Sequence, residues 1–543
     1  MLQGMMMHQP LLVSRIIDYA RDMHPDAEII SATLKGGIHR TSYPEIHKRI
    51  CQLAHGLRAM GIKPGDRVAT LAWNGYRHFE LYYAIAGIGA VCHTINPRLS
   101  ADQFTYIVNH AQDTALFFDT TFTPLVEGYA PDLPASLRYV ALCDQDRLPD
   151  SSLDLTAYET ILDGHPETIE WPDFDEDTAC ALCYTSGTTG DPKGVLYSNR
   201  GMMLHSMWVT IFQRTTFAPG TRILPVVPLF HANAWGLPYA AALTGCSLIF
   251  PGAKLDGESI FNLMEDEQVF SGWGVPTVWL GVLAEMDKRG RKPSHLGEVL
   301  SGGSSVAPSL IERFMKGYGI EVYQGWGMTE MSPVGTLSLM TPEMAARPLE
   351  ERMELKALAG RKIFGVDMKI VDEGGAALPE DGEAEGELLV RGNAICSGYF
   401  ENPDASKAAI MDGWFRTGDV ARIAPDGWLS ITDRAKDLIK SGGEWISSID
   451  VENTALAHPG VANAAVIAIP HPKWDERPLL VVQKEPGADP TSEELRAHVG
   501  AHLAKWQVPD AVEFVDALPL TATGKVSKRT LRAQFKDHPI GEA

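Results

Sequence analysis

The chain is poor in the features that mark secreted, membrane-spanning and nucleic-acid-binding proteins. Its 543 residues hold only seven cysteines, scattered from Cys51 to Cys396, which is too few for a disulfide framework and indicates a reducing compartment. No basic run offsets the formal net charge of −22, which argues against a nucleic-acid partner. Residues 1–22 place no basic segment ahead of an apolar run, so we expect no secretory signal peptide. The predicted location is therefore the cytoplasm.

Long apolar runs are scarce too, and the one long uncharged stretch is interrupted by prolines. From Ile223 up to Lys254 there is no Asp, Glu, Lys or Arg, a length that could cross a bilayer. Pro225, Pro228 and Pro238 lie inside it and would break an isolated spanning helix. We therefore interpret this stretch as buried strand, loop and helix, and expect no stable membrane insertion.

What is present is the composition of an ordinary globular protein, with 45% hydrophobic and 21% charged residues. The length suits one large composite domain and a small one. Between residues 42 and 118, amphipathic helical patterns alternate with short apolar strands, which predicts an α/β fold with parallel sheets. Residues 130–177 are polar and rich in proline, and are predicted to be a connecting segment.

The predicted pattern of helices and strands changes in the last third of the chain. Residues 388–418 indicate the short strands and turns of a small β-subdomain. Beyond a boundary predicted at residues 432–436, helical and strand patterns indicate a compact α+β unit. The predicted fold class is α/β, with a large N-terminal domain of parallel α/β sheets plus the β-subdomain over residues 1–432, and a small α+β C-terminal domain over residues 433–543.

Residues 184–195, YTSGTTGDPKGV, gather hydroxyl groups, glycines and a lysine in one turn. Gly187 and Gly190 allow backbone conformations in which successive N–H groups converge on an anion. Lys193 adds a positive charge, and the hydroxyl donors are Thr185, Ser186, Thr188 and Thr189. Because Lys193 follows a proline, the spacing is not that of a Walker A loop. The stretch predicts a phosphate-binding loop that follows a buried strand.

This stretch resembles the phosphate-binding signature of the adenylate-forming superfamily, which holds acyl-CoA synthetases, peptide-synthetase adenylation domains and luciferases. Further strings follow in the superfamily's order: PLFHANAWG at 228–236, VLSGGSSVAP at 299–308, EVYQGWGMTE at 321–330, RTGD at 416–419 and PLTATGKVSKRTLR at 519–532. The resemblance covers nearly the whole chain. It implies activation of a carboxylic acid by ATP through an acyl adenylate, with a C-terminal domain that moves.

The resemblance also implies where ATP binds. Trp326 would stack on adenine, where the superfamily usually has tyrosine, and Asp419 would accept the ribose hydroxyls with Arg434 as its partner. Thr185 and Glu330 are the implied Mg²⁺ ligands, since a hard cation prefers oxygen. The other implied ATP or AMP contacts are Ser186, Gly187, Thr188, Thr189, Gly190, Lys193, Gly302, Gly303, Gln324, Gly325, Gly327, Met328, Thr329, Lys436 and Lys440.

Two strings imply the acyl site. In PLFHANAWG, His231 would line the carboxylate site and Trp235 would gate an acyl tunnel, the alternative for both being packing in the core. The full implied acyl-binding set is His231, Trp235, Gly302, Gly327 and Pro333. In EVYQGWGMTE, Tyr323, Trp326, Thr329 and Glu330 are expected just after a strand, because open α/β sheets bind ligands at the carboxyl ends of strands.

The closing string places Lys525 on a loop that is predicted to protrude. The resemblance implies that Lys525 swings into the site for adenylation and that Lys436 is the hinge, whereas a merely solubilising lysine is the alternative. The implied CoA contacts are Lys440, Gly442, Gly443 and Trp445, and the implied catalytic residues are Lys525, Glu330, Thr185 and His231.

We therefore interpret the chain as an ATP-dependent acyl-CoA ligase that uses Mg²⁺ and CoA. Short aliphatic acids, medium-chain fatty acids and thioether acids such as 3-methylmercaptopropionate all suit the HANAW and GWGMTE strings. An aryl-CoA ligase or luciferase-like enzyme, a stand-alone adenylation enzyme and a non-catalytic nucleotide sensor stay open, as does a homodimer. A peptide-synthetase module is disfavoured because we expect no carrier domain after Ala543.

Overall fold

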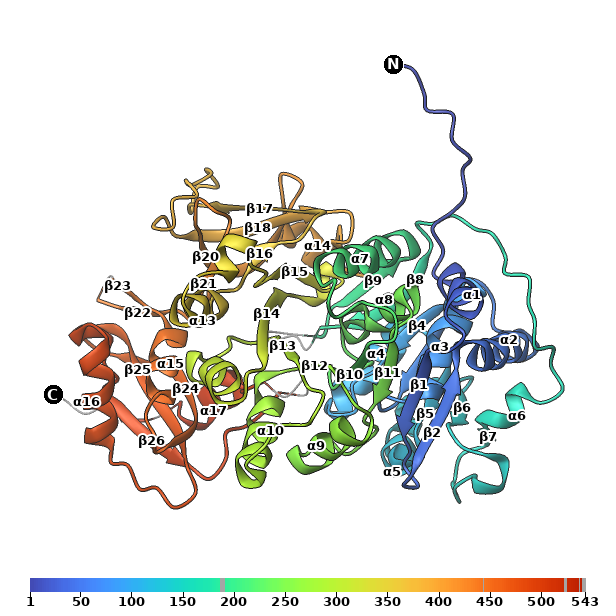
Figure 1. The fold of residues 1–543 in the computed structure, drawn as a ribbon, viewed down its shortest axis with the longest axis horizontal. Coiled ribbons are helices and arrows are strands. Elements are labelled where there is room, and N and C mark those ends of the chain that lie inside the picture. The colour runs from blue at the N-terminus through green and yellow to red at the C-terminus, as the bar shows by residue number, and fades with distance from the viewer. Residues whose placement is uncertain (186–190, 443, 522–524, 537, 540–543) are drawn as a thin grey trace.

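The computed structural model describes residues 1–185, 191–442, 444–521, 525–536 and 538–539. Within these residues the strands form four sheets, of nine, seven, five and five strands (Figure 1). The predictions for Ser186, Gly187, Thr188, Thr189, Gly190 and Gly443 fall outside the described residues.

Two largely parallel sheets build the N-terminal part. The first has the order β16-β15-β14-β13-β12-β10-β11-β1-β2 and the second β7-β6-β5-β3-β4-β8-β9. The strands of the first sheet are β1 Glu28–Ala32, β2 Ile38–Ser42, β10 Arg222–Pro225, β11 Ser247–Phe250, β12 Ser271–Gly274, β13 Glu298–Gly302, β14 Glu321–Gly327, β15 Val334–Leu337 and β16 Arg361–Lys362. Those of the second are β3 Arg67–Leu71, β4 Val91–Thr94, β5 Asp113–Phe118, β6 Arg138–Ala141, β7 Leu155–Ala157, β8 Ala179–Tyr184 and β9 Gly194–Ser198.

Helices of this part begin where the sequence provides caps. Ser42 and Ser100 each form a reciprocal capping box at the start of α2 and α4. The helices are α1 Ser14–Met23, α2 Tyr43–Ala59, α3 Tyr76–Gly87, α4 Ala101–Ala111, α5 Thr123–Tyr129, α6 Tyr158–Leu162, α7 Asn199–Phe212, α8 Leu237–Thr244, α9 Gly257–Asp266, α10 Pro276–Arg289, α11 Pro308–Glu312, α12 Pro342–Ala345 and α13 Leu349–Ala357. One apolar core joins residues of both large sheets with those of α1, α2, α3, α7 and α8.

Two smaller antiparallel-rich sheets complete the molecule (Figure 1). The third sheet is the β-subdomain, formed by β17 Val366–Val371, β18 Gly386–Gly392, β19 Ile410–Met411, β20 Trp414–Ile423 and β21 Leu429–Arg434, with α14 Pro403–Ala409 beside it. The fourth contains β22 Ile439–Ser441, β23 Glu444–Ile446, β24 Val461–His471, β25 Asp475–Lys484 and β26 Ala511–Val515, with helices α15 Ser448–Leu456, α16 Ser492–His502 and α17 Lys528–Gln534.

The predicted fold class is confirmed: parallel α/β sheets, a β-subdomain and a small α+β unit are all present. The exact division after residue 432 stays a prediction; β21 ends at Arg434 and the fourth sheet begins at Ile439. Mobility of the last unit also stays a prediction.

Two predictions on local structure were wrong. Residues 130–177 are not a plain connector, because β6 and β7 extend the second sheet in parallel beyond β5; these strands are too short to form a visible pattern. Tyr323 and Trp326 lie within β14 rather than after it, because β14 is held by β13 on one side and β15 on the other as far as Gly327. Thr329 and Glu330 do follow the strand, in the short helix η6 Thr329–Met331.

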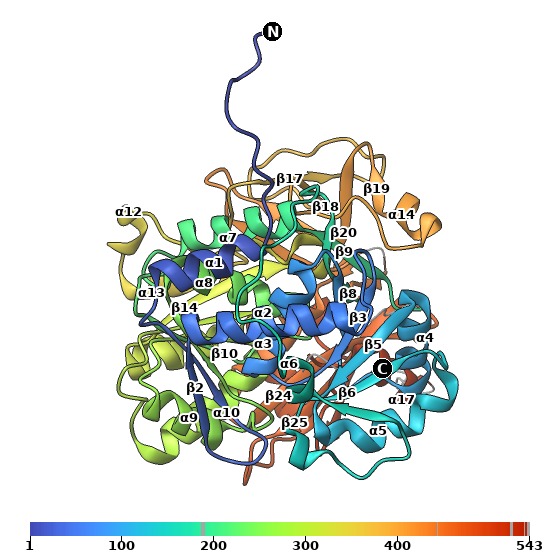
Figure 2. The same cartoon turned by 90° about the vertical axis from the view of Figure 1, so that its right-hand side faces the viewer.

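The most exposed large apolar side chains lie in the N-terminal arm. Residues 1–10 leave the body as an extended segment (Figure 2), and Met5, Met6 and Met7 on it are fully or nearly fully exposed. Among the described residues, no helix combines the length and the apolarity needed to cross a membrane. The uncharged stretch at 223–253 contains instead β10, the short helix η4 Ala232–Gly236, α8 and β11, as its prolines predict.

Candidate active site

One cavity of about 1710 Å³ is lined by residues of the large sheets, the β-subdomain and the C-terminal unit. It brings together most of the predicted site residues that the structure describes: Thr185, Lys193, His231, Trp235, Gly302, Gly303, Gln324, Gly325, Trp326, Gly327, Met328, Thr329, Glu330, Pro333, Asp419, Arg434, Lys436 and Lys525. The predicted residues Lys440, Gly442 and Trp445 do not line it. The sequence thus locates one common cavity from strings up to 340 residues apart.

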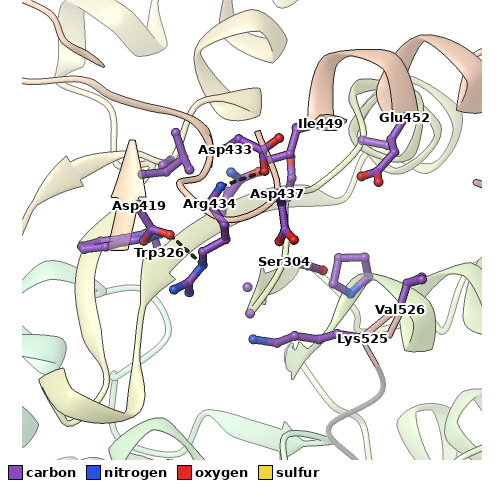
Figure 3. Close-up of a pocket in the computed structure, with 18 of the residues that line it drawn as sticks. Ser304, Trp326, Asp419, Asp433, Arg434, Asp437, Ile449, Glu452, Lys525 and Val526 are labelled. Atoms are coloured by element: carbon purple, nitrogen blue, oxygen red, sulfur yellow. Dashed lines mark hydrogen bonds and ion pairs between the residues drawn. The ribbon is translucent and has the colours of Figure 1, made fainter. Parts of the chain in front are cut away.

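A carboxylate with two oriented partners forms one wall (Figure 3). Asp419 on β20 lies directly opposite Arg434 on β21 in the antiparallel register, and Arg434 Nε is 2.7 Å from Asp419 Oδ1. Trp326 Nε1 donates to Asp419 Oδ2 at 2.9 Å. Burial raises the pKa of Asp419, while the Arg434 cation and the indole N–H oppose that rise. Each carboxylate oxygen retains acceptor capacity, so this group can still accept hydroxyl hydrogens from a ligand.

A second acidic group lines the same cavity. Glu330 is 7% exposed, and its Oε1 accepts a hydrogen bond of 2.8 Å from the Tyr399 hydroxyl. Burial raises the pKa of Glu330, and Tyr399, Arg434 and Lys193 oppose that rise. Lys193 Nζ lies 5.0 Å from the centre of the Tyr399 ring. Tyr399 therefore contacts both Glu330 and Lys193.

Lys525 reaches this cavity from the C-terminal unit (Figure 3). Its stem runs against Gly303, where an added Cβ would lie 3.1 Å from Lys525 Cε. Burial, and then the Arg434 cation, lower the pKa of Lys525 to about 8, against the attraction of Asp419 and Glu330. The loop that was predicted to protrude thus directs its lysine into the cavity, opposite the acidic wall.

The residues predicted to bind the acyl group lie in one part of the cavity lining. An added Cβ on Gly302 would lie 3.2 Å from the Trp235 ring, and one on Gly327 would lie 2.0 Å from the carbonyl oxygen of Pro333. Only glycine fits at either position. Burial, followed by the charge of Lys525, lowers the pKa of His231 to about 3. A neutral imidazole and closely packed backbone thus flank the point that Lys525 faces.

Residues 17–400 match the family model described as AMP-binding enzyme, and residues 450–525 match its C-terminal domain. The chain belongs to the AMP-binding enzyme family.

Relatives of this AMP-binding enzyme agree with that assignment. It is 48% identical to 3-methylmercaptopropionyl-CoA ligase of Ruegeria lacuscaerulensis, over 99% of this chain and 100% of the relative. It is 44% identical to medium-chain-fatty-acid–CoA ligase of Ectopseudomonas oleovorans, over 98% of each chain. ATP-bound MatB from Rhodopseudomonas palustris superposes with a TM-score of 0.82 at 26% identity, over 96% of this chain and 99% of that one. The resemblance to the adenylate-forming superfamily is confirmed.

The segment that carries Trp235 has an unusual backbone. Ala232, Asn233, Ala234 and Trp235 all have φ between 44° and 59°, and Gly236 continues at 81°. These residues form η4 Ala232–Gly236 as a left-handed turn, at a cost of roughly 1–2 kcal/mol for each non-glycine residue. All five are buried, so packing holds the AMP-binding enzyme's tryptophan in place.

Sequence reasoning missed several residues that support the site. His205 on α7 accepts a hydrogen bond from the Val334 backbone N–H at 3.1 Å, and its ring lies against Gly236; burial lowers the pKa of His205 to about 3. Tyr399, which lies in the turn SGYF at residues 397–400, was not predicted either. Its signal was an aromatic residue in a polar, glycine-containing turn, which is weak without its contacts.

The C-terminal unit is fastened to the β-subdomain at the predicted hinge. Asp433 Oδ2 accepts hydrogen bonds from the backbone N–H of Ser448 at 2.7 Å and from its hydroxyl at 2.6 Å. Ser447 Oγ donates to the carbonyl of Thr432 at 2.7 Å. In this arrangement Lys440 and Trp445 lie on the hairpin of β22 and β23, with Trp445 48% exposed. The pose therefore has Lys525 inside the cavity and the hairpin outside it.

The lowered pKa of Lys525 predicts an alkaline limb in the pH profile. The ammonium is charged below about pH 8 and loses its charge as the pH rises through that value, so kcat/KM for pyrophosphate release should fall there, since this parameter reports pKa values of the free enzyme. In Lys525→Arg the side chain stays charged, so whatever activity remains should lack this limb. If Lys525→Arg shows the same alkaline limb, the limb arises from the titration of another group.

Proposed function

We propose that this AMP-binding enzyme joins an aliphatic carboxylic acid to CoA, through an acyl adenylate and with release of AMP and pyrophosphate. The observation that carries the proposal is the position of Lys525 in one cavity with His231, Glu330 and the pair Asp419–Arg434. A carboxylate and the α-phosphate of ATP repel each other, and an ammonium fixed between them offsets that repulsion. The relatives named as CoA ligases support the second step.

In this proposal each wall has a separate task. Asp419 and Arg434 hold the ribose and Trp326 stacks on the base, while Lys193 and the phosphate loop hold the phosphates. Thr185 and Glu330 would hold Mg²⁺, which would neutralise phosphate charge when bound. Among the residues described, no cluster of three His, Cys, Asp or Glu could hold a metal ion. This fits a cation that takes one or two protein ligands and otherwise substrate phosphates and water.

CoA would act after the C-terminal unit turns about Lys436 and brings Lys440, Gly442, Gly443 and Trp445 toward the cavity. A cytoplasmic location follows from the acidic, cysteine-poor composition, and a homodimer remains a further proposal. A non-catalytic sensor is disfavoured because Glu330, Arg434 and Lys525 are present together and converge.

A panel of acids tests the function. Propionate, 3-methylmercaptopropionate, hexanoate, decanoate and benzoate are each supplied with Mg-ATP, with and without CoA, and both pyrophosphate and thioester are measured. We expect at least one of the aliphatic acids to yield both products when CoA is present. Pyrophosphate and adenylate without thioester would identify a stand-alone adenylation enzyme, a preference for benzoate would identify an aryl-CoA ligase, and no pyrophosphate with any acid would leave a nucleotide sensor.

A further inference from the structure

The part of the cavity lined by Trp235 ends on a column of aromatic rings. The centre of the Trp273 ring lies 6.3 Å from that of Trp235, and Phe217 stands 5.9 Å from Trp273 on a T-shaped contact. These separations are those of aromatic rings in direct contact. The exposed fractions are 7% for Trp235, 0% for Trp273 and 6% for Phe217. No space for an acyl chain is left between the rings.

The cavity reaches the first ring and stops. Trp235 lines the cavity together with Gly302, whereas neither Trp273 nor Phe217 lines it. A movement of Trp235 alone would therefore not open a passage along this direction, because Trp273 occupies the space behind it. Trp273 is itself fixed, since its indole N–H donates to Ser271 Oγ at 3.2 Å and its strand, β12, is paired on both sides.

We infer that Trp273 is a second stop behind Trp235, and that it restricts this enzyme to short aliphatic acids. The inference rests on the proposed function and specifies the substrate class of the same site. Identity to relatives leaves the length open, because their names include both a substituted propionyl group and medium-chain fatty acids. The aromatic column favours short acids, because an acyl group that extends through the cavity toward Trp235 meets a wall of rings.

Trp279 on α10, which packs against the opposite face of β12, supplies a matched control. Side chains alternate across a strand, and added Cβ atoms on Gly272 and Gly274 would each lie 2.8 Å from the ring of Trp279. Trp279 therefore packs on the face of β12 opposite to Trp273, in a different apolar cluster. It is equally buried. Trp279→Leu should thus destabilise the fold much as Trp273→Leu does, without opening the acyl side.

The test compares kcat/KM for pyrophosphate release over straight-chain acids from propionate to decanoate, in the unchanged enzyme, Trp273→Leu and Trp279→Leu. A methylene in an apolar pocket changes this parameter by about 10–200-fold. We expect the unchanged enzyme to lose activity steeply with acids longer than pentanoate, and Trp273→Leu to regain at least about tenfold on hexanoate or octanoate relative to propionate. Trp279→Leu should keep the original profile.

The outcomes separate the two proposals. If the unchanged enzyme uses decanoate as well as propionate, or if folded Trp273→Leu has the same length profile as Trp279→Leu, the second stop is disproved while the ligase function stands. If the unchanged enzyme releases no pyrophosphate with any acid, the proposed function fails, and the inference fails with it. Trp273→Phe, which preserves more of the core, gives the same comparison should Trp273→Leu not fold.

Discussion

Lys525→Ala is expected to lower pyrophosphate release from acid and ATP by about 10²–10³-fold, the usual contribution of one preorganised electrostatic donor. Its ammonium lies opposite Asp419 and Arg434 and against Gly303, where carboxylate and α-phosphate would meet. The same variant should convert supplied acyl adenylate and CoA into thioester at close to the normal rate, because the second step would use a pose in which Lys525 has left the cavity.

The half-reactions are measured separately, by pyrophosphate release and by thioester formation from synthetic adenylate. Lys505→Ala is the matched control, since Lys505 is an exposed lysine of the same C-terminal unit that does not line the cavity. It should leave both rates unchanged. An equal loss of both half-reactions in folded Lys525→Ala would refute the division of labour between two poses.

Glu330→Gln is expected to lower adenylation by at least about 10–100-fold, because even groups that only support a metal ligand are commonly worth that much. Gln preserves the shape and can still accept the hydrogen bond of Tyr399, but it removes the anionic oxygen for Mg²⁺. The loss should appear in both directions of the adenylate reaction, and a raised Mg²⁺ concentration should partly restore the rate.

Isotope exchange between ATP and pyrophosphate across a Mg²⁺ titration measures this effect. Tyr399→Phe is the companion variant, because it removes only the hydrogen bond to Glu330 Oε1. It should lower the rate of adenylation less than Glu330→Gln does. A purely structural glutamate predicts the reverse result: a lower melting temperature for Glu330→Gln and normal turnover at low Mg²⁺.

The local chemistry of the loops could be predicted from the sequence, and the partners of those loops could not. Thr185, Asp419 and Lys525 each sit in a short string whose glycines and polar residues suggest a ligand-binding turn. Tyr399 donates to Glu330, 69 residues away, and its ring lies near Lys193. Its neighbours in sequence indicate neither contact. Trp273 likewise reads as an ordinary core tryptophan until the position of Trp235 is known.

The backbone geometry of the segment with Trp235 could not be predicted from the sequence either. Nothing in Ala232, Asn233 and Ala234 announces four left-handed residues in succession, because only asparagine and glycine adopt that conformation readily. The short strands β6 and β7 were missed for a related reason, since their stability comes from parallel pairing with a distant neighbour and not from their own residues.

The hydrogen bonds between Ser448 and Asp433 bear on the order of adenylate formation and thioester formation. In the structure these hydrogen bonds are made, Lys525 lines the cavity and Trp445 on the hairpin is exposed. An adenylate formed in this pose would wait, out of reach of the thiol, until these hydrogen bonds break. Without CoA we therefore expect a burst of pyrophosphate equal to the amount of enzyme and then a stall, and with CoA a ping-pong pattern in which pyrophosphate departs before the thiol reacts.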